Sequence, residues 1–433
     1  MFLSLNLLCG ITAQAHGIWG HIHVTGWAME YTEHPDLQEL FSDPDMRNAA
    51  LFGAAFTDSG YFPFSESTSQ YSRIYSEYTH WEPFVHDYIQ WMKLNDPPPF
   101  TSPESKKRVA FLLGTASHGL QDEIFDSLFL HRAQEEDGEG QDSLDPACDG
   151  FLARDGELRF FPSEDIPFAP LLDIYSQLDP NISAEVIEDS VELMVGLYVN
   201  EDSGQSTAQS LADLYGENLI WTAQNYLNPD IPGSIQSEII PTAKYMEAIW
   251  KRLHDELTPE EFIIATYPAQ GRVLNTIDHT SSGSWVTAIF GTGIDIEQIE
   301  TSLRSEMGAS ISSVHTGTQW GASWTRLLRI QPQEPLQRNH TYVVHIENLH
   351  SATEETQEKD GFLVHTECSP ATSLDCLRIG IPDVASRTGE LVEEPVNPSS
   401  SCSHTPLKNI FGGLLLMFGV VTVFSRKEKQ TYI

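Results

Sequence analysis

The chain has 433 residues and a formal net charge of −38, because 62 Asp and Glu residues outnumber 24 Lys and Arg residues. Binding to nucleic acid depends on clustered positive charge, so this balance argues against DNA or RNA as a partner. The length exceeds one ordinary hydrophobic core and predicts two domains with additional terminal segments.

The N-terminal segment Met1–Ala15 has the pattern of a signal peptide. A short apolar run, Phe2–Leu8, precedes Ala13-Gln14-Ala15, which matches the small-residue pattern of signal-peptide cleavage sites. The pattern predicts export and a mature chain that begins at His16. A retained N-terminal helix is the alternative interpretation.

Residues 16–257 have a mostly helical pattern, with proline- and glycine-containing breaks such as Asp96-Pro97-Pro98-Pro99. Apolar residues recur at helical spacing in Asp36–Phe41, Ser183–Tyr198 and Thr242–Leu257. Such spacing places the apolar side chains on one face of a helix. We therefore predict one all-α helical domain over residues 16–257.

Within this domain His118, Asp122 and Asp126 recur at every fourth position, behind the apolar run Val109–Gly114. On a helix, residues with this spacing share one face. The apolar run belongs in a core, so the face with the carboxylates should be partly buried, and buried carboxylates need a partner. A divalent metal ion compensates several carboxylates at once. A solvated polar helix face is the alternative.

Further residues of the types that bind metals occur elsewhere in the helical domain. They are His21, His23, Asp58, His80, Asp145 and Asp149. A lone histidine in an aromatic stretch is usually a hydrogen-bonded core residue, and an aspartate near glycine usually forms a turn. The occurrence of several such residues in one domain nevertheless favours a shared metal site.

Two motifs occur in a characteristic order: Thr79-His80-Trp81-Glu82-Pro83-Phe84, and then Ser117-His118 with Asp122 four positions after the histidine. Together with Asp58 in a Phe- and Pro-containing turn, they resemble the zinc-dependent phospholipase C family, especially its branch related to glycosylphosphatidylinositol-specific phospholipase D. The resemblance covers residues 16–257. It implies an all-α bundle with a trinuclear zinc cluster that cleaves phosphodiester bonds, on a fold shared with single-strand-specific nucleases.

The resemblance also implies ligand roles. The residues that would hold one metal ion are Asp58, His80, His118 and Asp122. Asp122 would bridge to a second ion, held by His23 and by the N-terminal residue, which is His16 if cleavage follows Ala15. His21 is the alternative to His23.

The third site departs from the family, which has histidine at the positions of Asp126 and Asp145 and a carboxylate at that of Asp149. Three aspartates form an all-oxygen site, and such sites favour Mg²⁺, Ca²⁺ or Mn²⁺ over zinc. The predicted cofactors are therefore two or three Zn²⁺ ions, with a third site that holds a harder cation or none. The alternative ligands there are Glu123, His131 and Cys148.

After Pro259 the pattern changes to short β-type runs, separated by turn residues at intervals typical of a sandwich. The runs are Phe262–Thr266, Ser284–Phe290, Trp324–Ile330 and Thr341–Ile346. They predict an all-β sandwich over residues 260–368. The segments Thr266–Gly271 and Pro332–Gln337, the second followed by Thr341–Val344, resemble bacterial Ig-like modules of surface proteins.

The C-terminal residues divide into three segments. Residues 369–405 are rich in Pro, Ser and Glu without periodicity, which predicts a linker. Residues 406–425 contain the almost wholly apolar stretch Ile410–Phe424, and residues 426–433 form a basic tail. This order predicts a transmembrane anchor with its basic end inside, or a sorting segment that is removed.

The resemblance implies a metal-dependent phosphodiesterase, a phospholipase C-type hydrolase of phospholipid headgroups. Asp58 is the candidate catalytic residue, which would orient or deprotonate the attacking water. The expected partners are a phospholipid or other phosphodiester, the membrane through the C-terminal segment, and a surface partner of the Ig-like domain. The protein should be exported and lie at the cell surface. The alternative is that it is released after its C-terminal tail is processed. The competing functions are a non-catalytic, metal-stabilised surface binding protein and a nuclease or phosphatase on the same fold.

Overall fold

The computed structural model describes residues 16–366, except for segments at 63–65, 139–140, 217, 269–272, 275–280, 283–284, 306–307, 318–323, 339 and 353–355. The predicted signal peptide, linker, membrane or sorting segment and basic tail lie outside the described residues. No helix in the described part of the chain is long and apolar enough to cross a membrane.

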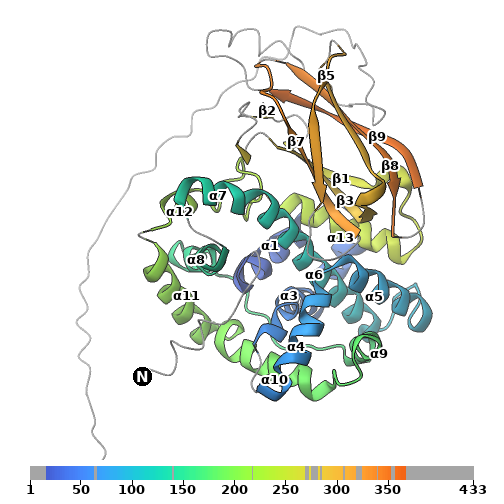
Figure 1. The fold of residues 1–433 in the computed structure, drawn as a ribbon. Coiled ribbons are helices and arrows are strands. Elements are labelled where there is room, and N and C mark those ends of the chain that lie inside the picture. The colour runs from blue at the N-terminus through green and yellow to red at the C-terminus, as the bar shows by residue number, and fades with distance from the viewer. Residues whose placement is uncertain are drawn as a thin grey trace, which may run out of the picture. The chain divides into compact units, whose positions relative to one another are not determined.

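The N-terminal part is helical, which confirms the prediction from the apolar spacing (Figure 1). Its α-helices are α1 Ile18–Tyr31, α2 Pro35–Ser42, α3 Pro44–Phe56, α4 Glu66–Thr79, α5 Glu82–Asn95, α6 Pro103–Ile124, α7 Leu130–Asp137, α8 Gln141–Arg154, α9 Phe168–Leu178, α10 Ala184–Met194, α11 Glu201–Tyr215, α12 Ile220–Asn225 and α13 Ile239–Leu253. A 3-10 turn, η2 (Ser59–Tyr61), follows α3, and the π-helical turns η3 (Phe125–Phe129) and η4 (Val195–Val199) continue α6 and α10.

Helix α6, which carries His118 and Asp122, begins at a well-formed cap. The Ser102 side chain accepts a hydrogen bond from Ser105 N, and Pro103 occupies the first helical position, where a missing N–H breaks no helical bond. From Val109 onward nearly every residue of the helix is buried. The ligand-bearing half of α6 therefore lies inside the helical part, so its polar side chains are buried with it.

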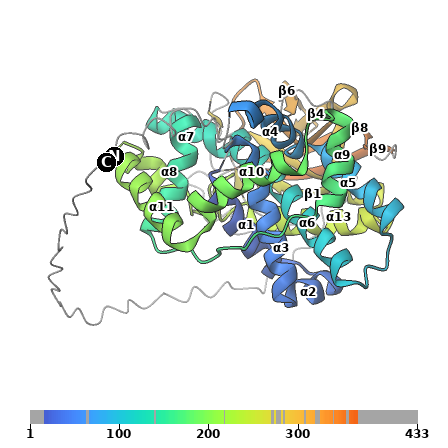
Figure 2. The same ribbon diagram turned by 90° about the horizontal axis from the view of Figure 1, so that it is seen from below.

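Helices α3 and α6 cross at close range, with α1 in contact with both (Figure 2). A Cβ atom added to Gly114 would lie 1.9 Å from Ala50 O, and one added to Gly53 would lie 2.4 Å from Phe111 O. Only glycine allows the two backbones to approach this closely. The crossing places the end of α3, from which Asp58 follows, beside the ligand-bearing half of α6.

The C-terminal described part consists of strands in two sheets (Figure 1). The strands are β1 Ile263–Tyr267, β2 Val273–Leu274, β3 Val286–Asp295, β4 Glu300–Ser305, β5 Ser310–Ile311, β6 Ser313–Gly317, β7 Trp324–Pro332, β8 Thr341–His350 and β9 Thr356–Thr366. The sheet orders are β1-β3-β7-β6 and β2-β9-β8-β4-β5, antiparallel except where β2 pairs with β9. The predicted change from helices to strands is confirmed.

The two sheets share a hydrophobic core. Phe290 and Leu328 contribute to it from one sheet, and Val344 and Phe362 from the other. Alternation along each strand directs these side chains inward, as expected for a sandwich. The Ig-like character of the sandwich stays a prediction.

The strands also pack directly on the helices. Tyr267, Ile289 and Leu327 belong to the hydrophobic core of the helical part. Helix α13 contacts β1 and β3, and β7 contacts both α5 and α6. The connection between the last helix and the first strand is short, from Leu253 to Ile263. The strands and the helices therefore follow closely in sequence, and the contacts above show that they share a core.

Candidate metal centre

Asp122 lies among three imidazoles. Its Oδ2 is 3.3 Å from His80 Nε2 and 3.4 Å from His118 Nε2. Its Oδ1 is 3.1 Å from His21 Nε2. His80 directly follows α4, His118 lies one turn before Asp122 on α6, and His21 lies on α1. Three segments distant in sequence therefore converge on one carboxylate.

Asp58 faces the same imidazoles from the end of α3. Its Oδ1 is 3.3 Å from His80 Nε2 and 3.6 Å from His118 Nε2. The ligand atoms of His21, His118 and Asp122 lie within 4.8 Å of one another, and so do those of Asp58, His80 and His118. His118 belongs to both groups. We call these five residues the imidazole–carboxylate centre.

Each imidazole of the centre has its Nδ1 on a carbonyl oxygen. The pairs are His118 with Ala54 O at 2.6 Å, His80 with Ser76 O at 2.7 Å and His21 with Gln121 Oε1 at 2.9 Å. A carbonyl oxygen only accepts, so each Nδ1 carries a proton, and the Nε2 atoms of His80 and His118 can present their lone pairs to the centre. His21 Nε2 also lies 3.1 Å from the carbonyl oxygen of His16. The Nδ1 contacts are typical of metal-binding histidines, whose outer nitrogen is held by a carbonyl or carboxylate.

The buried polar atoms of the centre fit a divalent cation. Within the described chain, both oxygens of Asp58 and Asp122 and the Nε2 atoms of His80 and His118 have no hydrogen-bond partner. Unpaired buried polar atoms are costly, and a shared cation would satisfy all of them. A mixed set of imidazoles and carboxylates suits zinc.

The pKa values of the centre reflect the same proximity. Burial alone would lower the pKa of His80, but Asp58 and Asp122 raise it to about 9. Burial alone would raise the pKa of Asp122, but the imidazoles of His118 and His21 lower it well below its usual value. The pKa of His21 is also raised, whereas that of His118 is lowered by burial, so a metal ion that binds here must displace protons from His80 and His21.

The structure places His21 in the centre and His23 outside it, which corrects the assignment of His23 as a ligand. Residues two apart on α1 point to different sides of the helix. His23 Nδ1 donates to Trp19 O at 2.8 Å, and its Nε2 accepts a hydrogen bond from Arg159 N at 2.7 Å. Both nitrogens are thus bonded to the backbone.

His16 is buried beside His21, with ring centroids 5.5 Å apart. Its carbonyl oxygen lies 3.1 Å from His21 Nε2, and its ring Nε2 lies 2.9 Å from Glu238 Oε2. The residue predicted to begin the mature chain therefore lies next to the centre. It also connects the centre to a group of carboxylates.

We call Asp126, Asp145, Asp149 and Glu238 the carboxylate cluster. Asp145 is fully buried, and neither of its oxygens has a hydrogen-bond partner among the described residues. Burial, followed by repulsion from Asp126, raises the pKa of Asp145 well above its usual value. Burial, and then Asp122 and Asp126, raise the pKa of Glu238 in the same way. The cluster thus brings acidic groups together with few compensating charges.

Asp149 has a structural role that sequence reasoning did not predict. It accepts hydrogen bonds from Gly20 N at 2.8 Å and from Trp19 N at 3.2 Å, and so caps the N-terminus of α1. Burial raises its pKa to about 7, although these two N–H donors act in the opposite direction. The cap competes with the predicted role of Asp149 as a metal ligand.

Asp126 lies beyond the α-helix that carries His118 and Asp122. The α-helix ends at Ile124, and Asp126 lies in the wider turn η3. A π-helical turn rotates the following side chains relative to the helix before it. The charge of Asp126 acts on Asp145 and Glu238, and the face that it shares with His118 and Asp122 stays a prediction.

Sequence reasoning missed Glu238, which precedes α13 and has no distinguishing motif around it. Among the alternative ligands, Glu123 is bonded to Arg326, and His131 packs on the ring of Trp285 at 5.0 Å. Burial raises the pKa of the Cys148 thiol, which disfavours the thiolate that a metal ion requires.

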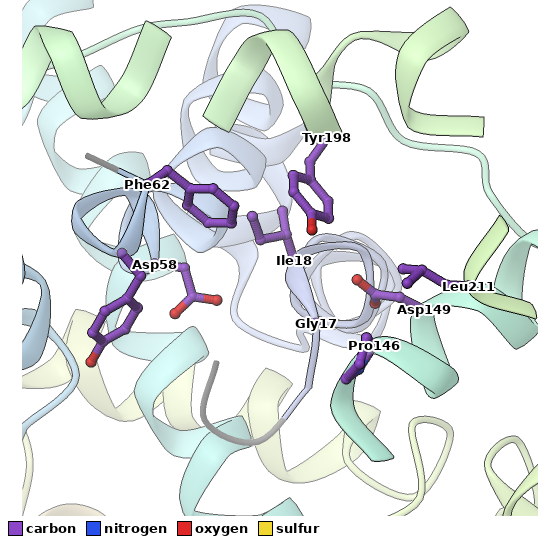
Figure 3. A pocket seen from close by; sticks show the side chains of 9 residues that line it. Gly17, Ile18, Asp58, Phe62, Pro146, Asp149, Tyr198 and Leu211 are labelled. Carbon is purple, nitrogen blue, oxygen red and sulfur yellow. The ribbon is translucent and has the colours of Figure 1, made fainter. Parts of the chain in front are cut away.

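A pocket opens beside the centre (Figure 3). Its lining residues are Gly17, Ile18, Asp58, Tyr61, Phe62, Pro146, Asp149, Tyr198 and Leu211. Asp58 and Asp149 lie on opposite sides of it, and Tyr198 projects toward it from η4. The pocket is small and combines acidic and apolar side chains.

The fold and the centre together define a helical protein with a candidate metal site and a β sandwich packed on it. No family model matches the chain. The chain is similar to phosphatidylinositol-glycan-specific phospholipase D of Bos taurus, with 29% identity over 134 residues. The matched segment is 30% of this chain and 16% of the relative. This similarity supports a distant phospholipase-related link.

Two solved structures show weak similarity. CopC from Methylosinus trichosporium OB3b has 20% identity and a TM-score of 0.20, over 25% of this chain and 96% of that chain. The S-layer protein SbsC has 9% identity and a TM-score of 0.21, over 74% of this chain and 46% of that chain. Both TM-scores are too low to support a conclusion about fold or function.

Proposed function

We propose that this protein is a metal-dependent phosphodiesterase, a phospholipase C-type hydrolase of phospholipid headgroups. The observation that carries the proposal is the convergence of three imidazole Nε2 atoms on the carboxylates of Asp58 and Asp122. The similarity to a phospholipase D over part of the chain supports a phospholipid as the substrate class. Membership in the zinc-dependent phospholipase C family, which the sequence motifs suggest, is also part of this proposal.

The imidazole–carboxylate centre would hold Zn²⁺, and the carboxylate cluster would hold a harder cation or none. When bound, such cations supply positive charge for the phosphoryl oxygens and acidify water. The tied Nδ1 atoms of the histidines fix the ring orientations, so little rearrangement is needed when a metal ion binds.

Asp58 is the candidate catalytic residue because it belongs to both the centre and the pocket lining. Its Oδ1 faces His80 and His118. Its second oxygen has no hydrogen-bond partner in the described chain and can orient a water molecule or accept its proton. A phosphodiester in the pocket would lie between this carboxylate and the apolar side chains of Phe62 and Tyr198.

We also propose that the protein is exported and lies at the cell surface, held by its C-terminal segment. This proposal rests on the sequence patterns of Met1–Ala15 and Ile410–Phe424. An anchored enzyme would meet its lipid substrate directly at the membrane. An Ig-like sandwich would offer a surface for a further partner.

A non-catalytic, metal-stabilised binding protein is the second candidate. The observation that favours it is the carboxylate cluster, where Asp149 is engaged in the cap of α1. A nuclease or phosphatase on the same fold is the third, and the net charge of −38 disfavours a nuclease.

The test is metal analysis of the purified full chain, followed by assays with phosphatidylinositol, phosphatidylcholine, a nitrophenyl phosphodiester and single-stranded DNA. Two or more zinc ions per chain with diacylglycerol release is the expected result, and an Asp58→Asn variant should be slower by about 10²- to 10⁴-fold. Bound zinc without any hydrolysis would favour the binding protein. Cleavage of DNA alone would favour the nuclease.

A further inference from the structure

Arg326 lies on β7, yet its side chain is fully buried against the helices. Its Nε donates to Glu123 Oε1 at 2.6 Å, and its backbone N donates to Glu123 Oε2 at 3.1 Å. Its Nη2 donates to His80 O at 2.7 Å. One residue of the sandwich thus holds two helical segments that both carry metal-ligand candidates.

An irregularity in the sheet explains how Arg326 reaches the helices. On β7, Leu327 pairs with Ile289 and Thr325 pairs with Ile294, so the register between β3 and β7 shifts across Arg326. Such irregularities redirect a side chain and release a backbone N–H from the ladder. Here Glu123 accepts hydrogen bonds from the released N–H and from the side-chain Nε.

The helical part leaves space for this guanidinium at Gly119. A Cβ atom there would lie 2.1 Å from His80 O and 2.9 Å from Arg326 Nη2. Gly119 directly follows His118 on α6. The absence of a side chain at this position therefore lets Arg326 approach the backbone of His80 behind the centre.

The contacts of Arg326 lie immediately behind the ligand atoms. Glu123 follows Asp122 on α6, and the His80 carbonyl belongs to the residue whose Nε2 faces Asp58 and Asp122. A buried arginine binds a carboxylate and a carbonyl through several directed N–H groups, so it fixes their relative positions. A shift of either segment would change the separation of His80 and Asp122.

We propose that Arg326 is a positioning residue through which the β sandwich sets the distance between His80 and Asp122. The sandwich is then part of the metal centre's support and not only a neighbouring module. This inference rests on the proposed function only in requiring that the centre binds metal. It does not require that the protein hydrolyses a phosphodiester.

A second buried ion pair near the same interface provides a matched control. Arg252 on α13 is bonded to Glu82, and both side chains are almost fully buried. None of the hydrogen bonds described for Arg252 reaches a residue of the centre. Loss of either arginine removes the positive charge that faces a buried carboxylate, so both variants should lose stability. Only the loss of Arg326 should also alter metal binding.

The experiment compares Arg326→Met, Arg326→Lys and Arg252→Met in the full chain. Zn²⁺ affinity is measured by competition with a chelating dye, and ligand geometry by the absorption spectrum of the Co²⁺-loaded protein. Arg326→Met should bind Zn²⁺ about 10- to 100-fold more weakly, the range for groups that orient metal ligands. Its Co²⁺ spectrum should shift, and Arg326→Lys should recover part of the affinity. Arg252→Met should keep both properties.

Wild-type affinity and an unchanged Co²⁺ spectrum in Arg326→Met would overturn the inference. The other contacts of the interface, such as Tyr267 OH with Ser237 O at 2.6 Å, favour folding of this variant. If it does not fold, Glu123→Gln removes the same charge pair at nearly constant volume and should weaken Zn²⁺ binding similarly. A wild-type chain that binds no metal would overturn the proposed function as well. A chain that binds zinc but hydrolyses nothing would leave this comparison valid.

Discussion

The imidazole–carboxylate centre and the carboxylate cluster lie in the same helical part but compensate charge differently. In the centre, three imidazoles face Asp58 and Asp122, and the pKa of Asp122 is lowered. In the cluster, Glu238 lies beside His16 and Asp149 accepts two backbone N–H groups. Burial and then repulsion from other acids nevertheless raise the pKa values of Asp145 and Glu238. The chain itself therefore compensates the charge of the centre, whereas the cluster needs a proton or a cation.

This difference bears on which ions each region would bind. Imidazole ligands favour zinc, whereas a set of carboxylates favours harder cations such as Mg²⁺, Ca²⁺ or Mn²⁺. It also bears on stability, because protons and cations compete for the cluster. Substitutions that act on one region and not on the other can separate these effects.

His118→Ala should have the largest effect, because His118 belongs to both groups of the centre. We expect loss of the zinc bound there and turnover reduced to background. Metal analysis and a phosphodiester assay measure both. His131→Ala is the control, since His131 packs on Trp285 away from the centre. Undiminished activity of the His118 variant would remove the centre from the mechanism.

A matched pair on α1 tests the correction from His23 to His21. His21→Ala should lower the zinc content by about one ion per chain and reduce turnover, because His21 Nε2 faces Asp122. His23→Ala should keep its zinc and lose about 1–3 kcal/mol of stability, because Arg159 N loses its acceptor. Metal analysis with denaturant unfolding separates the two, and the reverse pattern would restore His23 as the ligand.

The stability of the chelator-treated protein should depend on pH in a defined direction. The pKa of Asp149 is raised to about 7, so the folded state keeps a proton that the unfolded state has released. The pKa of His80 is raised to about 9, so at pH values above the usual histidine pKa the folded state also keeps a proton on His80 that the unfolded state has released. Between pH 7 and 9, where the buried histidines with lowered pKa values (His16, His23 and His118) are neutral in both states, the free energy of unfolding should therefore fall as pH rises.

Thermal unfolding with a chelator at pH 5, 7 and 9 measures this dependence. Saturating zinc should weaken or reverse the trend, because a metal ion replaces the protons. An increase in stability from pH 7 to pH 9 in the chelated protein would contradict the charge pattern described for the two regions.

Asp145→Asn should have the smallest effect on the free energy of unfolding. It should increase stability, unlike the other substitutions. Removing one acid from a group of mutually repelling acids should stabilise the chelated protein at pH 8. Asp155→Asn is the control, because Arg154 lowers the pKa of Asp155 and its loss should slightly destabilise the protein. Chemical unfolding compares them, and destabilisation by Asp145→Asn would show that Asp145 is compensated.

The sequence predicted the architecture well, because apolar spacing depends only on local geometry. The resemblance to a known family also brought together His80, His118, Asp58 and Asp122. It assigned the ligand role on α1 to His23, with His21 as the alternative, because both histidines are buried and only the packing of α1 on α6 determines which one faces Asp122. That packing is a tertiary property.

Other parts of the site required contacts that no local pattern contains. The π-helical turn that contains Asp126 has no distinctive composition. Glu238 reaches His16 across 222 positions, and Arg326 reaches Glu123 across 203. Each resembles an ordinary surface charge in the sequence. Their burial becomes visible only when the strands are packed on the helices.

The close crossing of α3 and α6 has a consequence for protein engineering. Gly53 and Gly114 bring the two backbones together, and the spacing between Asp58 and His118 depends on that approach. The two glycines contribute no ligand atom, yet a methyl group on either would separate the helices. Placing only the ligand residues on another helical bundle would therefore copy the donor atoms without the short distance between helices that brings these atoms together.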